Sequence, residues 1–147
     1  MGFGVSGSTA VVFLGVLIAS GTLYTAAAGS AERVSEARNV EGEELLDRRN
    51  TVIEVTEVVY NNSTDTLDVA VTNNGTTTLS VADTSLLVDN EYVRPNATVV
   101  DGDGDTDVWA SDQRLVITVD TGVVPDRVKV VAENGVATSN TTIEEVG

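Results

Sequence analysis

The residues of this chain that could do chemistry are mainly carboxylates. It holds 23 Asp and Glu residues but no cysteine and no histidine. Cysteine nucleophiles, histidine general bases, disulfides and most zinc sites are therefore excluded. The serines and carboxylates show no spacing typical of a catalytic pair, so no enzyme activity is predicted.

The densest group of carboxylates lies in residues 101–107, which read DGDGDTD. Calcium prefers oxygen ligands, so one interpretation is a calcium site formed by Asp101, Asp103, Asp105 and Asp107. The segment departs from an EF-hand, because Thr106 replaces the turn glycine, Asp112 replaces the bidentate glutamate, and the flanks are typical of strands. The alternative is a solvated acidic turn, and no other cofactor is predicted.

Five N-x-[ST] sequons are a second kind of candidate site, at Asn61, Asn62, Asn74, Asn96 and Asn140. All of them fall in expected turns or near expected strand ends. Glycosylation requires exposed loops on the outer side of a membrane. These asparagines are glycosylation candidates if the segment that carries them lies outside the cell membrane.

The net charge of −15 is concentrated after Asn50. Six of the 23 acidic and four of the eight basic residues precede Asn50, which leaves 17 against four and a charge of −13. Nucleic-acid binding needs a basic surface and is not expected. The composition is typical of proteins adapted to high salt, although an acidic function such as calcium binding would look similar.

The charge also predicts salt-dependent stability. Like charges repel less as ionic strength rises, so the melting temperature of residues 50–147 should increase between dilute buffer and molar salt. A flat response in a calorimetric salt series would show that the acidic surface does not control stability.

A long apolar segment precedes all these candidates, because residues 1–31 contain no charged side chain. Within it, Thr9–Ala28 is long enough for one crossing of a bilayer, at about 30 Å of helix. Two alternatives are a secretory signal cleaved after Ala28 and a buried core helix. The first lacks a basic start, and the second would bury an all-round apolar helix in a small acidic domain.

The expected helix continues past the membrane, from Ser8 to Asp47, with residues 32–50 as a stalk. Arg48, Arg49 and Asn50 are typical of a helix C-terminus. At Thr51 the pattern changes to short β-branched runs, so the predicted parts are 1–31 with the span, 32–50 and a globular ectodomain over 51–147.

The ectodomain is predicted to be an immunoglobulin-like antiparallel β-sandwich of seven to nine strands. Side chains alternate inward in three runs: Leu67, Val69 and Val71; Leu115, Ile117 and Val119; Val128, Val130 and Ala132. A last strand is expected over Val136–Ile143, and Asn74-Gly75 predicts a hairpin turn. Trp109, the only tryptophan, is predicted to lie in the core.

The stretches MGFGVSGSTAVVFLGVLIASGTLYTAAAGSAERV and VTNNGTTTLSVADTSLLVDNEYV resemble the archaeal flagellum (archaellum) accessory proteins of the FlaF and FlaG group, with FlaF the better match. The resemblance implies a sandwich anchored in the cytoplasmic membrane, lying beneath the S-layer and binding the S-layer glycoprotein as a stator-like part. It also implies other archaellum components as partners and, with the free sandwich edges, a homodimer.

Two other functions remain open: an archaellin- or pilin-like filament subunit, and a secreted or anchored adhesion domain. Pilins usually have a basic processing signal and an acidic residue near the mature N-terminus. Here nothing basic precedes Gly2 or Gly4 and the first carboxylate is Glu32. An accessory protein is expected to keep Met1 or lose only that residue.

The predicted orientation of the membrane span disagrees with the positive-inside rule. Arg33 and Arg38 follow the span and no basic residue precedes it, which by the positive-inside rule would place the ectodomain in the cytoplasm. Glu32 and Glu36 lie among these arginines, and the sequons and the resemblance indicate the outside. The ectodomain is therefore expected outside the membrane.

Overall fold

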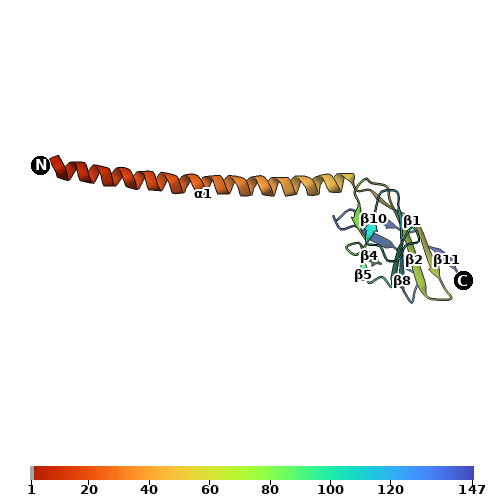
Figure 1. The fold of residues 1–147 in the computed structure, drawn as a ribbon. Helices are drawn as coiled ribbons and strands as arrows, with labels where there is room; N and C mark the ends of the chain where they lie inside the picture. The colour runs from red at the N-terminus through yellow and green to blue at the C-terminus, as the bar shows by residue number, and fades with distance from the viewer. Residues whose placement is uncertain (1) are drawn as a thin grey trace. The chain divides into compact units, whose positions relative to one another are not determined.

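The computed structural model describes residues 2–147, and they begin with one long helix, α1 (Gly2–Asn50), of 49 residues (Figure 1). The predicted continuous helix is confirmed, although it starts at Gly2 rather than Ser8. It ends at Asn50, with Arg48 and Arg49 in the last turn, where cations stabilise the negative end of the helix dipole.

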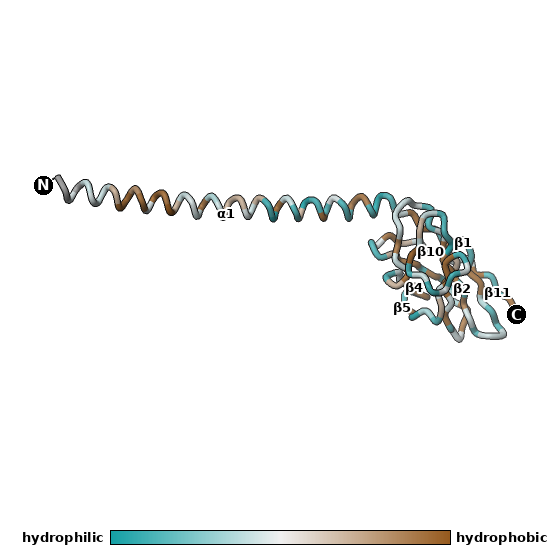
Figure 2. Tube along the Cα trace, viewed as in Figure 1, coloured by the Kyte–Doolittle hydropathy of each residue, from teal (hydrophilic) through white to brown (hydrophobic). Residues whose placement is uncertain are grey.

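Hydropathy divides α1 into two parts. The N-terminal half contains the longest hydrophobic stretch, whereas hydrophilic residues predominate toward Asn50, with a few hydrophobic residues among them (Figure 2). The helix is long and apolar enough to cross a membrane, by length and composition. Its side chains from Ser6 to Ala28 are exposed, so they are not buried against the rest of the chain that the structure describes.

The chain forms two compact units, one reaching to Glu43 and one over Glu44–Gly147. The second unit includes the last turns of α1 because they bind the β-domain, as described below.

Eleven strands follow the helix. Their bounds are β1 (Ile53–Asn61), β2 (Thr66–Asn73), β3 (Leu79–Ser80), β4 (Ser85–Val88), β5 (Glu91–Val93), β6 (Ala97–Val100), β7 (Val108–Trp109), β8 (Arg114–Asp120), β9 (Val128–Val131), β10 (Ala137–Asn140) and β11 (Glu144–Val146). Nine of them form the two main sheets, in the orders β11-β1-β2-β8-β6 and β10-β9-β4-β5, and β3 pairs with β7. The chain is mainly β with one long helix, and the predicted sandwich is confirmed.

The core lies between the five-stranded and the four-stranded sheet. The alternating residues expected to face inward are buried, with Leu67, Val69 and Val71 on β2 fully covered. Trp109 is 0% exposed, which confirms its prediction as a core residue. The alternation in these strands was a reliable guide because each has a solvent-facing side.

Three local predictions were wrong. The expected strand Val136–Ile143 is shorter, spanning Ala137–Asn140, because the Asn140 side-chain oxygen accepts a hydrogen bond from the Thr142 amide and turns the chain. The sandwich is also not entirely antiparallel, since β11 pairs with β1 in parallel. Asn74-Gly75 closes no hairpin, because β2 pairs with β1 and β8.

Candidate interaction surfaces

The end of α1 is bound to the turn that follows β2. The Asn50 carbonyl oxygen accepts hydrogen bonds from the amides of Thr76, at 2.8 Å, and Thr77, at 3.5 Å. The Asp47 carbonyl oxygen accepts from the hydroxyls of Thr51, at 2.6 Å, and Thr77, at 3.2 Å. The last carbonyls of a helix have no partner inside it, so these bonds satisfy them and hold the helix end on the sandwich.

Gly75 touches the same helix end. A Cβ atom added there would lie 2.3 Å from the Asn50 carbonyl oxygen and 2.5 Å from the Val52 amide nitrogen. Both are backbone atoms, which cannot rotate away as a side chain can. The junction therefore has room only for glycine at this position.

Gly75→Ala is expected to lower the free energy of unfolding by about 1–3 kcal/mol, as overpacked sites do. Amide hydrogen exchange at Thr76 and Thr77 should accelerate as the helix end loosens. Gly104→Ala is the control, because a Cβ there meets only an ordinary contact, 3.7 Å from the Thr98 carbonyl oxygen. Equal exchange in the Gly75 variant and the wild type would contradict the predicted restraint.

Asn73 joins two turns beneath this junction. Its side chain is 0% exposed, and its amide nitrogen donates to the carbonyl oxygens of Thr77, at 2.8 Å, and Trp109, at 3.2 Å. Its side-chain oxygen accepts from the Gly75 amide at 3.1 Å. Sequence reasoning missed Asn73; the only available signal was a polar residue at an inward position of β2.

The predicted calcium loop forms a tight turn at the edge of the five-stranded sheet. Asp101 and Gly102 have positive φ angles of 49° and 95°, and Val100 and Asp103 exchange backbone hydrogen bonds of 2.8 and 2.9 Å. The loop thereby folds back along β6 and pairs part of its outer edge. Covering an edge strand in this way hinders uncontrolled pairing with another chain.

Three of the four loop carboxylates bind the chain's own groups. The Asp101 carboxylate accepts from the Arg114 amide at 3.0 Å, and the Asp103 carboxylate from the Asp105 amide at 2.9 Å. Asp107 accepts from the Ala82 amide at 2.7 Å and the Ser80 hydroxyl at 3.1 Å. Among residues 2–147, no group of three or more acidic side chains is arranged to hold a metal ion. Calcium binding by Asp101, Asp103, Asp105 and Asp107 stays a prediction.

A polar groove of ≈ 600 Å³ lies beside the end of α1, within the unit that starts at Glu44. It is lined by Glu44, Asp47, Arg48, Thr77, Thr78, Asp83, Glu133 and Asn134. Small-molecule sites usually have mainly apolar walls with a few converging polar groups. This groove has mainly polar and charged walls, so it lacks the composition typical of a small-molecule site.

The five sequon asparagines lie in turns or at strand ends. Asn62, Asn74 and Asn96 are exposed, whereas Asn61 and Asn140 are half-buried. The side-chain oxygens of the latter two accept hydrogen bonds from the amides of Ser63 and Thr142. Glycosylation at these positions stays a prediction.

Tyr60 lies near the C-terminal end of β1, and its side chain is buried in the core. Its hydroxyl lies 3.1 Å from an Asp65 carboxylate oxygen and 3.2 Å from the Thr121 carbonyl oxygen, both acceptors for its proton. Burial, followed by the hydrogen bond to Asp65, raises the pKa of the Tyr60 phenol above its ordinary value.

A raised phenol pKa predicts loss of stability in alkali. The folded chain holds this proton more tightly than the unfolded chain, so the contribution is fully present below about pH 10 and is lost as pH rises through the folded-state pKa. In unfolding titrations at increasing pH, the wild type should lose more stability above pH 10 than Tyr60→Phe. Parallel pH profiles of the two proteins would contradict this.

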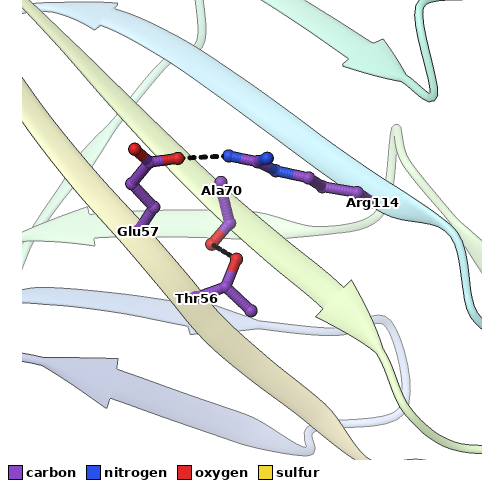
Figure 3. A network of polar contacts seen from close by, with 4 residues as sticks. All are labelled: Thr56, Glu57, Ala70 and Arg114. Carbon is purple, nitrogen blue, oxygen red and sulfur yellow. Dashed lines mark hydrogen bonds and ion pairs between the residues drawn. The ribbon is translucent and has the colours of Figure 1, made fainter.

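The outer face of the five-stranded sheet is acidic. Its outward residues include one arginine, Arg114, and the carboxylates Glu54, Glu57, Asp68, Asp120 and Glu144. Arg114 forms an ion pair with Glu57 across β2, beside the bond from the Thr56 hydroxyl to the Ala70 carbonyl oxygen (Figure 3). Ala70 is only 3% exposed although it lies on this outer side, since these side chains cover it.

The outer face of the four-stranded sheet carries no carboxylate on its strands. Its outward residues are Ser85, Leu87, Tyr92, Lys129, Val131, Ala137 and Ser139. The two sheets thus present different charges to solvent, a difference that the net charge of the chain conceals.

Solved structures that resemble the chain include the archaellum periplasmic stator protein FlaG from Sulfolobus acidocaldarius, with 16% identity over 61% of this chain and 97% of that one and a TM-score of 0.44. The stator complex of FlaF and FlaG from the same organism matches with 16% identity over 60% of this chain and 85% of that one, and a TM-score of 0.41. The ligand-binding region of Serine-glutamate repeat protein A of Enterococcus faecium has a TM-score of 0.38, at 16% identity over 67% and 98% of the two chains.

No curated protein matches the chain by sequence. The family model for archaeal-type flagellin matches residues 2–142, which include both the helix and nearly all of the sandwich. The predicted relationship to archaellum proteins is confirmed, and the chain belongs to the archaeal-type flagellin family.

Proposed function

We propose that the chain is a membrane-anchored structural component of the archaellum machinery, whose sandwich binds the S-layer glycoprotein outside the cytoplasmic membrane. The observation that carries the proposal is the continuity of α1. Its uncharged apolar half suits a bilayer, and its polar end is hydrogen-bonded into the sandwich at Asn50. A force on the sandwich would be passed directly to the last turn of the helix, as a stator-like part requires.

The length of α1 supports the same proposal. A helix of 49 residues is about 70 Å long, and about 30 Å of it would lie in the hydrocarbon core. The remainder is suited to a partner beyond the membrane surface. Other archaellum components would bind the same anchored chain, and the unpaired edge of β5 would permit a homodimer.

The experiment is capture of the full-length chain, in detergent at high salt, by isolated S-layer protein. Binding is expected, and its absence would contradict anchoring to the S-layer. A calcium-chelated arm tests the loop separately: loss of binding would support a bridging cation at residues 101–107, and unchanged binding would remove the loop from the interface. Protease digestion of intact cells tests orientation, because an ectodomain that stays protected would contradict an outside location.

A filament subunit is the second candidate, favoured by the match of the archaeal-type flagellin model through α1. Filament subunits of this plan are processed before assembly, whereas an anchor would keep Met1 or lose only that residue. Met1 lies outside the described residues. Mass spectrometry of the N-terminus decides between the two, since a cut several residues into the chain would favour the filament subunit.

A further inference from the structure

One face of the sandwich has a charge opposite to that of the chain as a whole. A row of cross-strand partners crosses the four-stranded sheet: Ser139 beside Lys129, Lys129 beside Leu87, and Leu87 beside Tyr92. The flanking residues of β4 and β9 are buried, so the row points outward. Arg94 follows β5 and lines a shallow groove of ≈ 350 Å³ with Tyr92. We call Leu87, Tyr92, Arg94 and Lys129 the tyrosine face.

The cations of this face are available to a partner. Of the four basic residues after Asn50, Arg114 pairs with Glu57 and the Arg127 guanidinium donates to Asn90. The side chains of Lys129 and Arg94 form no hydrogen bond or ion pair with any residue that the structure describes. Of the 17 carboxylates in the same region, Asp107 lines the groove beside Arg94, but it accepts hydrogen bonds from the Ala82 amide and the Ser80 hydroxyl and forms no ion pair with Arg94.

Tyr92 supplies an apolar anchor between the cations. It is 61% exposed and lies opposite the half-buried Leu87. Tyrosine and arginine are enriched among the residues that dominate binding energy at protein interfaces. Asp89 and Asn90 have positive φ angles and join Val88 to its partner Glu91 in a two-residue turn. Tyr92 therefore occupies a non-hydrogen-bonded position, and its backbone amide and carbonyl point away from β4 to the free edge.

We propose that the tyrosine face binds an acidic protein surface, with Tyr92 as the anchor and with Lys129 and Arg94 pairing with the partner's carboxylates. The inference rests on the proposed function and identifies the face of the sandwich that contacts the acidic partner. Charge complementarity favours the tyrosine face over the outer face of the five-stranded sheet. The latter would present five carboxylates and one arginine to an acidic partner, and like charges across an interface repel each other. None of the five sequon asparagines belongs to the tyrosine face.

The test compares capture of full-length variants, in detergent, by isolated S-layer protein at graded salt. Tyr92→Ala is expected to weaken binding about tenfold, as loss of an interface anchor does, and Lys129→Gln and Arg94→Gln should each weaken it several-fold. Two matched controls should bind as the wild type does. Val123→Ala truncates a residue that is 69% exposed, and Ala97→Glu makes the same change of charge on the five-stranded sheet and keeps the sequon at Asn96.

The possible outcomes separate the two proposals. If the wild type is captured and the tyrosine-face variants bind equally well, this inference is overturned and S-layer anchoring stands. If the wild type is not captured, the anchoring proposal fails and this inference fails with it. If the same variants abolish self-association but leave capture unchanged, the face binds a second copy of the chain and the inference is again overturned.

Discussion

Trp109→Ala is expected to cost the largest share of sandwich stability, about 3–5 kcal/mol. The indole is completely buried between the sheets, so its removal leaves a cavity that rigid strands cannot collapse to fill. It also removes the hydrogen bond from the indole nitrogen to the Gln113 carbonyl oxygen, 2.9 Å long. Urea titration of the full chain in detergent, read by pulse proteolysis of the sandwich, measures the loss.

Two further variants separate these contributions. Trp109→Phe keeps an aromatic ring in the core and removes only the indole hydrogen bond to the Gln113 carbonyl oxygen, which still accepts from the Asn73 amide at 3.1 Å, so a smaller loss is expected. Val123→Ala removes apolar atoms from an exposed position and should change stability by about 0.5 kcal/mol or less. A loss of under about 1 kcal/mol in Trp109→Ala would show that the β3–β7 side of the core is loosely packed.

Asn73→Ala is expected to destabilise the sandwich by about 2–4 kcal/mol, a large effect for a polar side chain. Truncation removes the hydrogen-bond partner of the Gly75 amide and of the Thr77 carbonyl oxygen, and it removes one donor to the Trp109 carbonyl oxygen, which keeps its place in the β3–β7 pair. Each unsatisfied buried group costs about 1–3 kcal/mol, partly recovered if water enters. Urea unfolding followed by the fluorescence of Trp109 reports on the same site.

The neighbouring asparagine is a matched control. Asn74 is exposed, and its side-chain amide donates to Glu54 at 2.9 Å. Asn74→Ala should therefore cost no more than about 1 kcal/mol. If the two substitutions cost the same, the buried hydrogen bonds of Asn73 would not be what holds the two turns together.

The features that were predictable from the sequence depend on residues close together in the chain. An uncharged stretch over residues 1–31 followed by helix formers indicates a long helix, and alternation at Leu67, Val69 and Val71 indicates a strand with one buried side. The lack of histidine and cysteine excluded whole classes of chemistry without any structural information. Each of these inferences needs only the period of a helix or strand, or the composition.

The bulge in β1 shows where such inference becomes weak. Register shifts between Val55 and Glu57, so Thr56 and Glu57 lie opposite Ala70 together. Two consecutive polar residues, followed by Val58 and then Tyr60 as inward residues, were a signal of this shift. The signal was not specific, because exposed strand ends produce the same pattern.

The remaining features were decided by contacts between distant parts of the chain. Glu144–Val146 has little strand propensity and becomes β11 only because β1 offers a free edge to it. Gly75 and Asn73 have ordinary turn sequences around them, and their importance comes from the helix end and from Trp109, which pack against them in the folded chain. The contrast between the acidic face and the tyrosine face follows from strand order, which assembles residues 52 positions apart, Leu87 and Ser139, into one row. The local sequence pattern determines which way a side chain points, but only the pairing of strands in a sheet determines which side chains become its neighbours.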